Sequence, residues 1–272
     1  MIKIRTNFKQ HIMLVILIFA FSLLSTLESS YAEDPVEEVK VGAYIFPPFF
    51  NAEGNSGLTV DFINWLNTRQ EKYHFSISNI PAKRRYQLLE ASYIHMILFE
   101  APEWGWNDSG VEFIETKEIM QGGEVIVAKS TEGRTQDYFK SISDKSIALI
   151  PGYHYGFADF NADPDWLREN FNVVFNSTHD SLIELILRDR VDVALIAQSF
   201  LNQYLAKHPD EKAQLLISEK LDQIYHLKAL VGKASPISAN EINDILDLAS
   251  HDGSLAAFFK SQGLEDRLSY TP

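Results

Sequence analysis

The sequence contains no cysteine in 272 residues. That absence excludes disulfide bonds, thiol catalysis and the cysteine-linked lipid anchor of a lipoprotein. The eight histidines are scattered, without the His-x-x-x-His or paired-carboxylate spacing that metal sites use. Glycine-rich phosphate loops and nucleophile-elbow motifs are also missing. The sequence therefore predicts neither a metal nor any other cofactor.

Positive charge is scarce, with 24 Lys+Arg against 37 Asp+Glu. Residues 1–32 hold three of these basic residues and one acidic residue, so the remainder carries a net charge of −15. Much of this charge belongs to residues on the ordinary solvated surface of a soluble protein. Such a surface repels nucleic acid and anionic lipid and favours encounter with cations. We expect no nucleic-acid partner.

Only one long apolar run is present, from Ile12 to Phe21. Lys3, Arg5 and Lys9 precede it, and the small-x-small sequence Ser30-Tyr31-Ala32 follows it. The run is shorter than the roughly 20 residues that span a bilayer. The pattern predicts a cleaved signal peptide over residues 1–32 and a periplasmic location, with an uncleaved N-terminal anchor as the alternative.

The stretch from Val41 to Leu66 organises the rest of the chain. An apolar strand runs into Pro47-Pro48, where strand pairing must stop because proline lacks an N–H donor. A Gly/Asn-rich hairpin then leads into an amphipathic helix that starts near Asp61. This order leaves Tyr44 and Phe46 at the carboxyl end of a strand, where open α/β sheets place their ligands.

Two series of strand, helix and buried strand follow one another, one before and one after residues 124–130. A late strand and two terminal helices lack a sheet of their own, so we expect them to return to the first half. The predicted fold class is therefore α/β, with two lobes, each a mainly parallel sheet flanked by helices, joined by two hinge strands. The predicted strands are 39–44, 73–77, 94–99, 124–128, 146–150, 173–175, 191–197 and 227–231. The predicted helices include 182–188, opened by a capping box at Ser181, and 239–249 and 254–261. We expect the hinge near 125–129 and 225–231, lobe I over 33–126 and 228–272, and lobe II over 127–227.

Four places in this order resemble the family 3 periplasmic solute-binding proteins of bacteria. They are the opening stretch, residues 88–97 with His95 where an Asp is usual, residues 180–196 with Arg190-Val191-Asp192, and the tail 243–264 with its Asp-Gly turn. The resemblance covers nearly all of the chain after the leader. It implies a monomeric binding protein, not an enzyme, which traps a small-molecule ligand between two lobes and serves an ABC permease or a membrane sensor.

The sequence departs from that family at both ends of the amino-acid clamp. Members that bind α-amino acids carry an Arg shortly after the first-lobe buried strand, whereas this chain has Trp104-Gly105-Trp106 there. They also place an Asp after the second-lobe buried strand, where this chain has Ala197 and Gln198. We therefore expect a small polar ligand other than a standard α-amino acid.

The candidate contact residues follow strand ends or open helices, and each also has a purely structural alternative. Aromatic rings can line a ligand or fill the core, and Glu100 or Arg85 can face a ligand or solvent. An uncharged set after the second-lobe strands offers hydrogen bonds. The predicted ligand-binding residues are Tyr44, Phe46, Arg85, Glu100, Trp104, Trp106, Tyr153, His154, Tyr155, Ser177 and Gln198.

An enzymatic alternative uses the same fold. The family's architecture also hosts a cyclohexadienyl dehydratase, in which a carboxylate and a hydrogen-bonding partner remove a proton in a closed cleft. Glu100 and His154 would be the pair, provided that both reach one substrate atom. The binding interpretation has its own requirement, because it needs an open crevice between the lobes rather than a gap filled by packed side chains.

Overall fold

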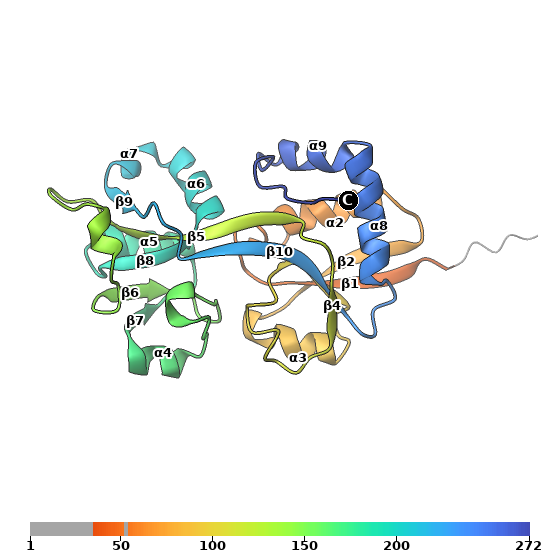
Figure 1. Cartoon of the computed structure of the whole chain (residues 1–272), viewed down its shortest axis with the longest axis horizontal. Helices are drawn as coiled ribbons and strands as arrows, with labels where there is room; N and C mark the ends of the chain where they lie inside the picture. The colour runs from red at the N-terminus through yellow and green to blue at the C-terminus, as the bar shows by residue number, and fades with distance from the viewer. Residues whose placement is uncertain (1–34, 52–53) are drawn as a thin grey trace, which may run out of the picture. The chain divides into compact units, whose positions relative to one another are not determined.

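The computed structural model describes residues 35–51 and 54–272, and the predicted signal peptide lies outside these residues. One compact unit comprises Val36–Pro272. Two groups of strands lie within it, and each is flanked by its own helices (Figure 1). In the described part of the chain no helix is both long and apolar enough to cross a membrane.

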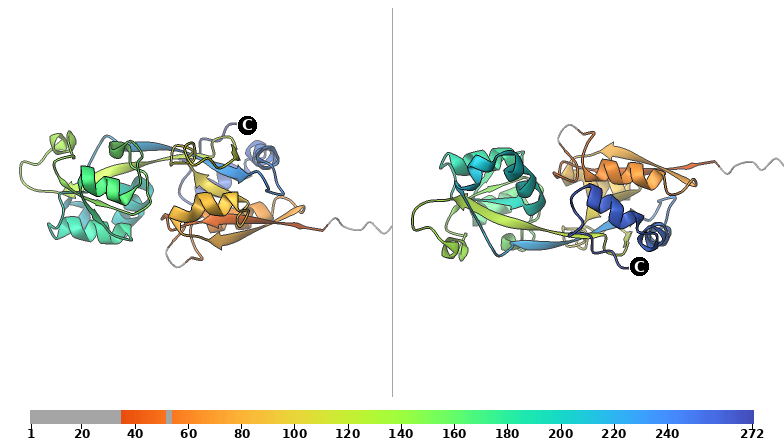
Figure 2. Two further views of the ribbon diagram at one scale, coloured as in Figure 1. Left: turned by 90° about the horizontal axis from the view of Figure 1, so that it is seen from below. Right: turned by 90° about the horizontal axis from the view of Figure 1, so that it is seen from above.

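The first lobe is built on a mainly parallel sheet. Strand β1 pairs in parallel with β2 and β3, and the second half of β10 adds an antiparallel strand against β3. Helix α2 packs against α9 through Phe62 and Phe259, on the side where Figure 2 shows the two helices close together. Its elements are β1 (Glu37–Ala43), α2 (Leu58–Asn67), β2 (Tyr73–Asn79), η1 (Ala82–Arg84), α3 (Arg85–Glu90), β3 (Met96–Glu100), β4 (Phe113–Glu115), α8 (Ala239–His251) and α9 (Ser254–Ser261).

The second lobe repeats the plan. Strand β6 pairs in parallel with β7 and β8, and the second half of β5 runs antiparallel to β8. The strands β3 and β8 are buried along their whole length, as expected of strands covered on both faces. Its elements are η2 (Gln136–Phe139), β6 (Ser146–Leu149), η3 (Gly156–Ala158), α4 (Pro164–Asn170), β7 (Asn172–Phe175), α5 (His179–Leu187), β8 (Val193–Ala197), α6 (Gln198–Lys207), α7 (Pro209–Lys212) and β9 (Leu215–Ile217).

Two long strands belong to both lobes, namely β5 (Met120–Lys129) and β10 (Gln223–Gly232). They pair with each other from Met120 to Glu124, and β5 then pairs with β8 from Glu124 onward. Figure 1 shows them side by side where the chain passes between the lobes. The predicted α/β fold with two hinge strands is confirmed, whereas the predicted lobe boundaries stay a prediction.

One predicted helix start is wrong. Helix α5 begins at His179, and its N-cap is Thr178, whose hydroxyl accepts the backbone N–H of Ser181 at 3.2 Å. The capping box predicted at Ser181 does not form there because Ser181 already lies inside the first turn. An earlier threonine with extended backbone geometry takes the capping position instead.

Strand β10 gives a direct test of this packing. Leu230 is fully buried, whereas Ile224 on the same strand is 59% exposed. Leu230→Ala should therefore lower the free energy of unfolding by about 2–5 kcal/mol because it leaves a cavity in the first lobe. Ile224→Ala should lower it by less than about 1 kcal/mol. Urea unfolding followed by circular dichroism measures both, and equal losses would contradict the packing.

Candidate functional site

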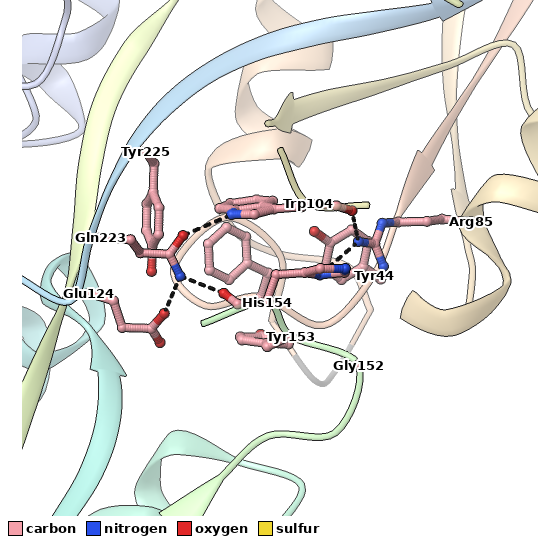
Figure 3. Close-up of a pocket in the computed structure, with 10 residues that line it drawn as sticks. Tyr44, Arg85, Trp104, Glu124, Gly152, Tyr153, His154, Gln223 and Tyr225 are labelled. Carbon is pink, nitrogen blue, oxygen red and sulfur yellow. Dashed lines mark hydrogen bonds between the residues drawn. The ribbon is translucent and has the colours of Figure 1, made fainter. Parts of the chain in front are cut away.

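A small cavity lies where the two lobes meet, and ten residues from both of them line it (Figure 3). Its volume is about 10 Å³, which leaves room for about one water molecule. Side chains therefore nearly fill the crevice that we expected to be open, so this requirement of the binding interpretation is not met in this conformation. The lining residues are Tyr44, Phe46, Arg85 and Trp104 from the first lobe, Glu124, Gln223 and Tyr225 from the hinge strands, and Gly152, Tyr153 and His154 from the second lobe.

Phe46 occupies the centre of an aromatic cluster in this cavity. Its ring meets Trp104 at 5.6 Å and Tyr153 at 5.5 Å between centroids, both nearly perpendicular, and Tyr225 at 6.1 Å. Trp104 and Tyr225 are also edge to face, at 5.0 Å. Because edge-to-face pairs are favourable, these rings hold the first lobe, the hinge and the second lobe together.

Gln223 connects three parts of the cavity by hydrogen bonds. The indole Nε1–H of Trp104 donates to Gln223 Oε1 at 3.0 Å, and Gln223 Nε2 donates to Glu124 Oε2 at 3.0 Å. The same Nε2 also donates to the carbonyl of His154. A buried side-chain amide with both ends bonded fixes the positions of its neighbours. Figure 3 shows this chain of contacts across the cavity.

The second lobe also touches the first directly. Tyr153 donates its hydroxyl to the carbonyl of Ile45 at 2.8 Å. Gly105 has φ +78°, and a Cβ there would lie 2.7 Å from the Tyr86 hydroxyl and 2.9 Å from His154 Nε2. Only glycine tolerates both this backbone conformation and this close approach. The lobes are therefore in a closed arrangement around the cavity.

Glu124 is the unusual ionisable group of the site, because it is 1% exposed and few polar partners offset the cost of burying its carboxyl group. Its Oε2 accepts from Gln223, but its Oε1 has no hydrogen-bond partner among the described residues. Burial raises the pKa of Glu124 to about 8, and the nearby Asp222 carboxylate raises it further, whereas the Tyr225 hydroxyl and the Gln223 amide beside it lower it. Near neutral pH this carboxyl group is mostly protonated.

Arg85 contributes a positive charge that is already compensated. Its Nε lies 3.6 Å from Glu100 Oε2, and both side chains are almost wholly buried. Its terminal nitrogens donate to the carbonyls of Ala82 at 2.7 Å and Trp104 at 3.0 Å. The guanidinium also lies over the Tyr86 ring, 4.4 Å from the centroid. The fork that would bind a ligand carboxylate is thus occupied by groups of the protein itself.

Six of the predicted contact residues line the cavity, and five do not. Glu100 and Trp106 are fully buried beside Arg85 and Tyr86 but are not part of the cavity wall. Tyr155 is fully buried, and its hydroxyl accepts the backbone N–H of Ile150. The role of all eleven residues in ligand binding stays a prediction. The six are Tyr44, Phe46, Arg85, Trp104, Tyr153 and His154.

The last two predicted residues lie outside the cavity. Ser177 lines a separate groove of about 320 Å³, bounded by Ile45 and Pro47 of the first lobe and by the start of α5 and one side of α6 of the second. The oxygen of the Gln198 side chain accepts from Arg267 at 3.0 Å. The crevice between the lobes is thus divided by the Tyr153–Ile45 contact into the small inner cavity and this wider groove.

Sequence reasoning missed Glu124, Gln223 and Tyr225. All three come from the hinge strands, which we had treated as connections between the lobes. A signal was present at Glu124, because a lone acid opens the otherwise apolar run Glu124–Ala128. Among residues 35–51 and 54–272, no cluster of three His, Asp or Glu residues could hold a metal ion.

No protein-family model and no curated protein matches the sequence significantly. Solved structures do match it. A histidine-bound substrate-binding protein of an ABC uptake transporter from Streptococcus pneumoniae is 18% identical, with a TM-score of 0.66 over 86% of this chain and 95% of that chain. The chain has the two-lobed fold of these binding proteins.

Other structures with this fold give the same result. A mutant of ArgBP from T. maritima is 18% identical, with a TM-score of 0.63 over 82% of this chain and 94% of that one. The GluR0 ligand-binding core from Nostoc punctiforme, in complex with L-glutamate, is 15% identical, with a TM-score of 0.62 over 82% and 98%. The two-lobed binding-protein fold therefore extends over most of this chain, at low sequence identity.

Glu124 should give the protein a measurable pH dependence. Below pH 8 the folded protein keeps a proton that an unfolded glutamate, with its ordinary pKa near 4.5, releases. The contribution of Glu124 to the free energy of unfolding is therefore full below about pH 4.5. It is lost as the pH rises through about 8, by at most about 1.4 kcal/mol per pH unit.

Glu124→Gln removes this proton while keeping an acceptor for Gln223. The variant should become more stable relative to the unmodified protein as pH rises from about 5 to about 8. The raised pKa values of Glu100 and Asp222 persist in both proteins and cancel in the comparison. Urea unfolding at several pH values measures the difference, and a difference that does not change with pH contradicts the assignment.

Proposed function

We propose that this chain is a periplasmic solute-binding protein. It captures a small polar solute between its two lobes and presents it to an ABC permease or a membrane sensor, acting as a monomer. The observation that carries the proposal is that side chains from the first lobe, the second lobe and both hinge strands converge on one cavity. The shared two-lobed fold supports it, because the matched structures bind histidine and L-glutamate.

Admission of a solute requires the lobes to separate. The inner cavity has about 10 Å³, whereas typical ligand sites have roughly 300 Å³ or more. Bending of β5 and β10 is the natural route, since these two strands join the lobes and a hinge needs few residues to rotate. A solute that binds residues of both lobes would then stabilise the closed arrangement by its differential affinity.

The proposed solute is not a standard α-amino acid. An α-carboxylate needs an available arginine fork, and the one arginine of the cavity wall is bound to Glu100, Ala82 and Trp104. An α-ammonium needs an acid after β8, where this chain has Gln198 bound to Arg267. The matched proteins with amino-acid ligands therefore indicate how the fold works rather than what this chain binds.

We do not favour the dehydratase alternative. It required Glu100 and His154 to act on one substrate atom. Arg85 contacts both of them, at 3.6 Å from the carboxylate of Glu100 and 3.4 Å from His154 Nδ1. Glu100 is also absent from the cavity wall. Burial lowers the pKa of His154 to about 3, so the imidazole is neutral and a poor proton acceptor near neutral pH.

A disulfide lock tests whether lobe opening admits the solute. A Cβ at Gly152 would lie 3.8 Å from the Ala82 Cβ, which suits a disulfide between the second lobe and the first. Because the chain has no cysteine, Ala82→Cys with Gly152→Cys forms one bond only. The oxidised protein should lose binding of any solute found by calorimetry among polyamines, amino acids and aromatic acids, and reduction should restore it.

The two single-cysteine variants are the matched controls under the same oxidising conditions. Gly152 has φ +86°, so Gly152→Cys alone measures the cost of backbone strain at this position. Equal affinity and binding rate in the oxidised and reduced double variant would contradict the clamp. Binding of plain α-amino acids alone would contradict the proposed solute class but leave the clamp intact.

A further inference from the structure

The inner cavity contains an acceptor that the protein itself does not satisfy. Glu124 Oε1 is buried and has no partner among the described residues, although its other oxygen is bonded to Gln223. Figure 3 shows the carboxyl group beneath Gln223, next to Tyr153. Buried polar atoms are nearly always hydrogen-bonded, so an orphan acceptor on a cavity wall indicates a missing donor. The cavity has room for about one water molecule in the closed arrangement, and a solute with an N–H group would displace that water and supply the donor.

Aromatic rings make up much of the remaining wall. Phe46, Trp104, Tyr153 and Tyr225 all line the cavity, within 5.0–6.1 Å of a neighbouring ring in the cluster. The faces of such rings carry negative electrostatic potential and attract cations, most strongly where water is excluded. The same rings also offer apolar area to an alkyl chain. A carboxylate next to several rings is the pattern expected around an organic ammonium group.

The charges around the cavity favour a cation over an anion. Arg85 is the only basic side chain in the cavity wall that is always charged, and Glu100 neutralises it. Asp222 adds a second carboxylate near Glu124, held by the backbone N–H groups of Gly156 and Phe157. An anion would meet the carboxyl groups of Glu124 and Asp222 and no available donor fork. The net charge of −15 outside residues 1–32 would also raise the encounter rate of cations.

We infer that the inner cavity, once it is widened by a partial separation of the lobes, binds a small protonated amine, with Glu124 as its counter-ion and the aromatic cluster around its alkyl part. This assignment rests on the proposed function, since the lobes must open to admit the amine. A protonated amine is favoured over a quaternary ammonium because the unpartnered carboxylate oxygen needs an N–H donor. The amine should carry no carboxylate, for which the cavity wall has no partner.

Binding of the amine should release a proton. In the closed cavity Glu124 is mostly protonated near neutral pH, because burial and Asp222 raise its pKa, and the remaining groups that face it are Tyr225, Gln223, Tyr153 and Tyr155. The pKa values of these tyrosines are also raised, so they stay neutral. The amine takes the place of the carboxyl proton and keeps the buried charge balanced. Affinity should therefore rise about tenfold per pH unit below pH 8.

The experiment uses the whole chain after residue 32 and three probes of similar size: butylamine, butyrate and butanol. Isothermal titration should show binding of butylamine only, with release of close to one proton per molecule near pH 6.5, measured in buffers of different ionisation enthalpy. Glu124→Gln should weaken this binding at least tenfold and abolish the proton release. Glu219→Gln, at an exposed position, is the matched control and should change neither quantity.

Circular dichroism checks that Glu124→Gln is folded, and Glu124→Asp, which keeps the charge, should retain part of the binding. Butylamine binding that survives Glu124→Gln, preferred binding of butyrate or butanol, or no binding of butylamine at millimolar concentration overturns the inference. The disulfide lock distinguishes this failure from that of the proposed function. If the disulfide lock still blocks the binding of another solute, the proposal that lobe opening admits the solute is supported. If the lock blocks no solute that binds, that proposal is contradicted as well.

Discussion

The antiparallel pairing of β5 with β10 is the constraint on which the rest of the structure depends. Over Met120–Glu124 and Gln223–Leu227 these two strands pair with each other, and β5 then continues along β8 whereas β10 continues along β3. The pairing returns the end of the chain to the first lobe, which completes that sheet and its helical cover. It also places Glu124, Gln223 and Tyr225 where the lobes meet. The pairing of β5 with β10 therefore determines both the fold and the position of the cavity.

Much of the fold was predictable because buried strands are recognisable in the sequence as apolar runs. Residues 94–99 and 191–197 are nearly continuous apolar runs, and they form the fully buried β3 and β8. The return of the last strand to the first lobe was predictable because this strand has no other sheet to join. Capping at α5 was harder, because Thr178 and Ser181 both suit an N-cap and only the backbone conformation decides between them.

The cavity was less predictable, because the faces of β10 contradict its hydrophobicity. Gln223 is 7% exposed while its neighbour Ile224 is 59% exposed. A reading by polarity alone would place the isoleucine inside and the glutamine outside. The glutamine is buried because Trp104 and Glu124, distant in sequence, supply its hydrogen-bond partners. A long-range network of this kind leaves no periodic signal in the strand that carries it.

The same network explains how the closed arrangement can be both stable and responsive. Opening the lobes would break the Trp104–Gln223 and Tyr153–Ile45 hydrogen bonds, which water can replace at modest net cost. It would also hydrate Glu124, whose burial without a partner for Oε1 is unfavourable, so part of the cost of opening is offset. A solute that supplies that missing donor and is contacted by both lobes favours their closure around it, so its binding free energy can draw the lobes together.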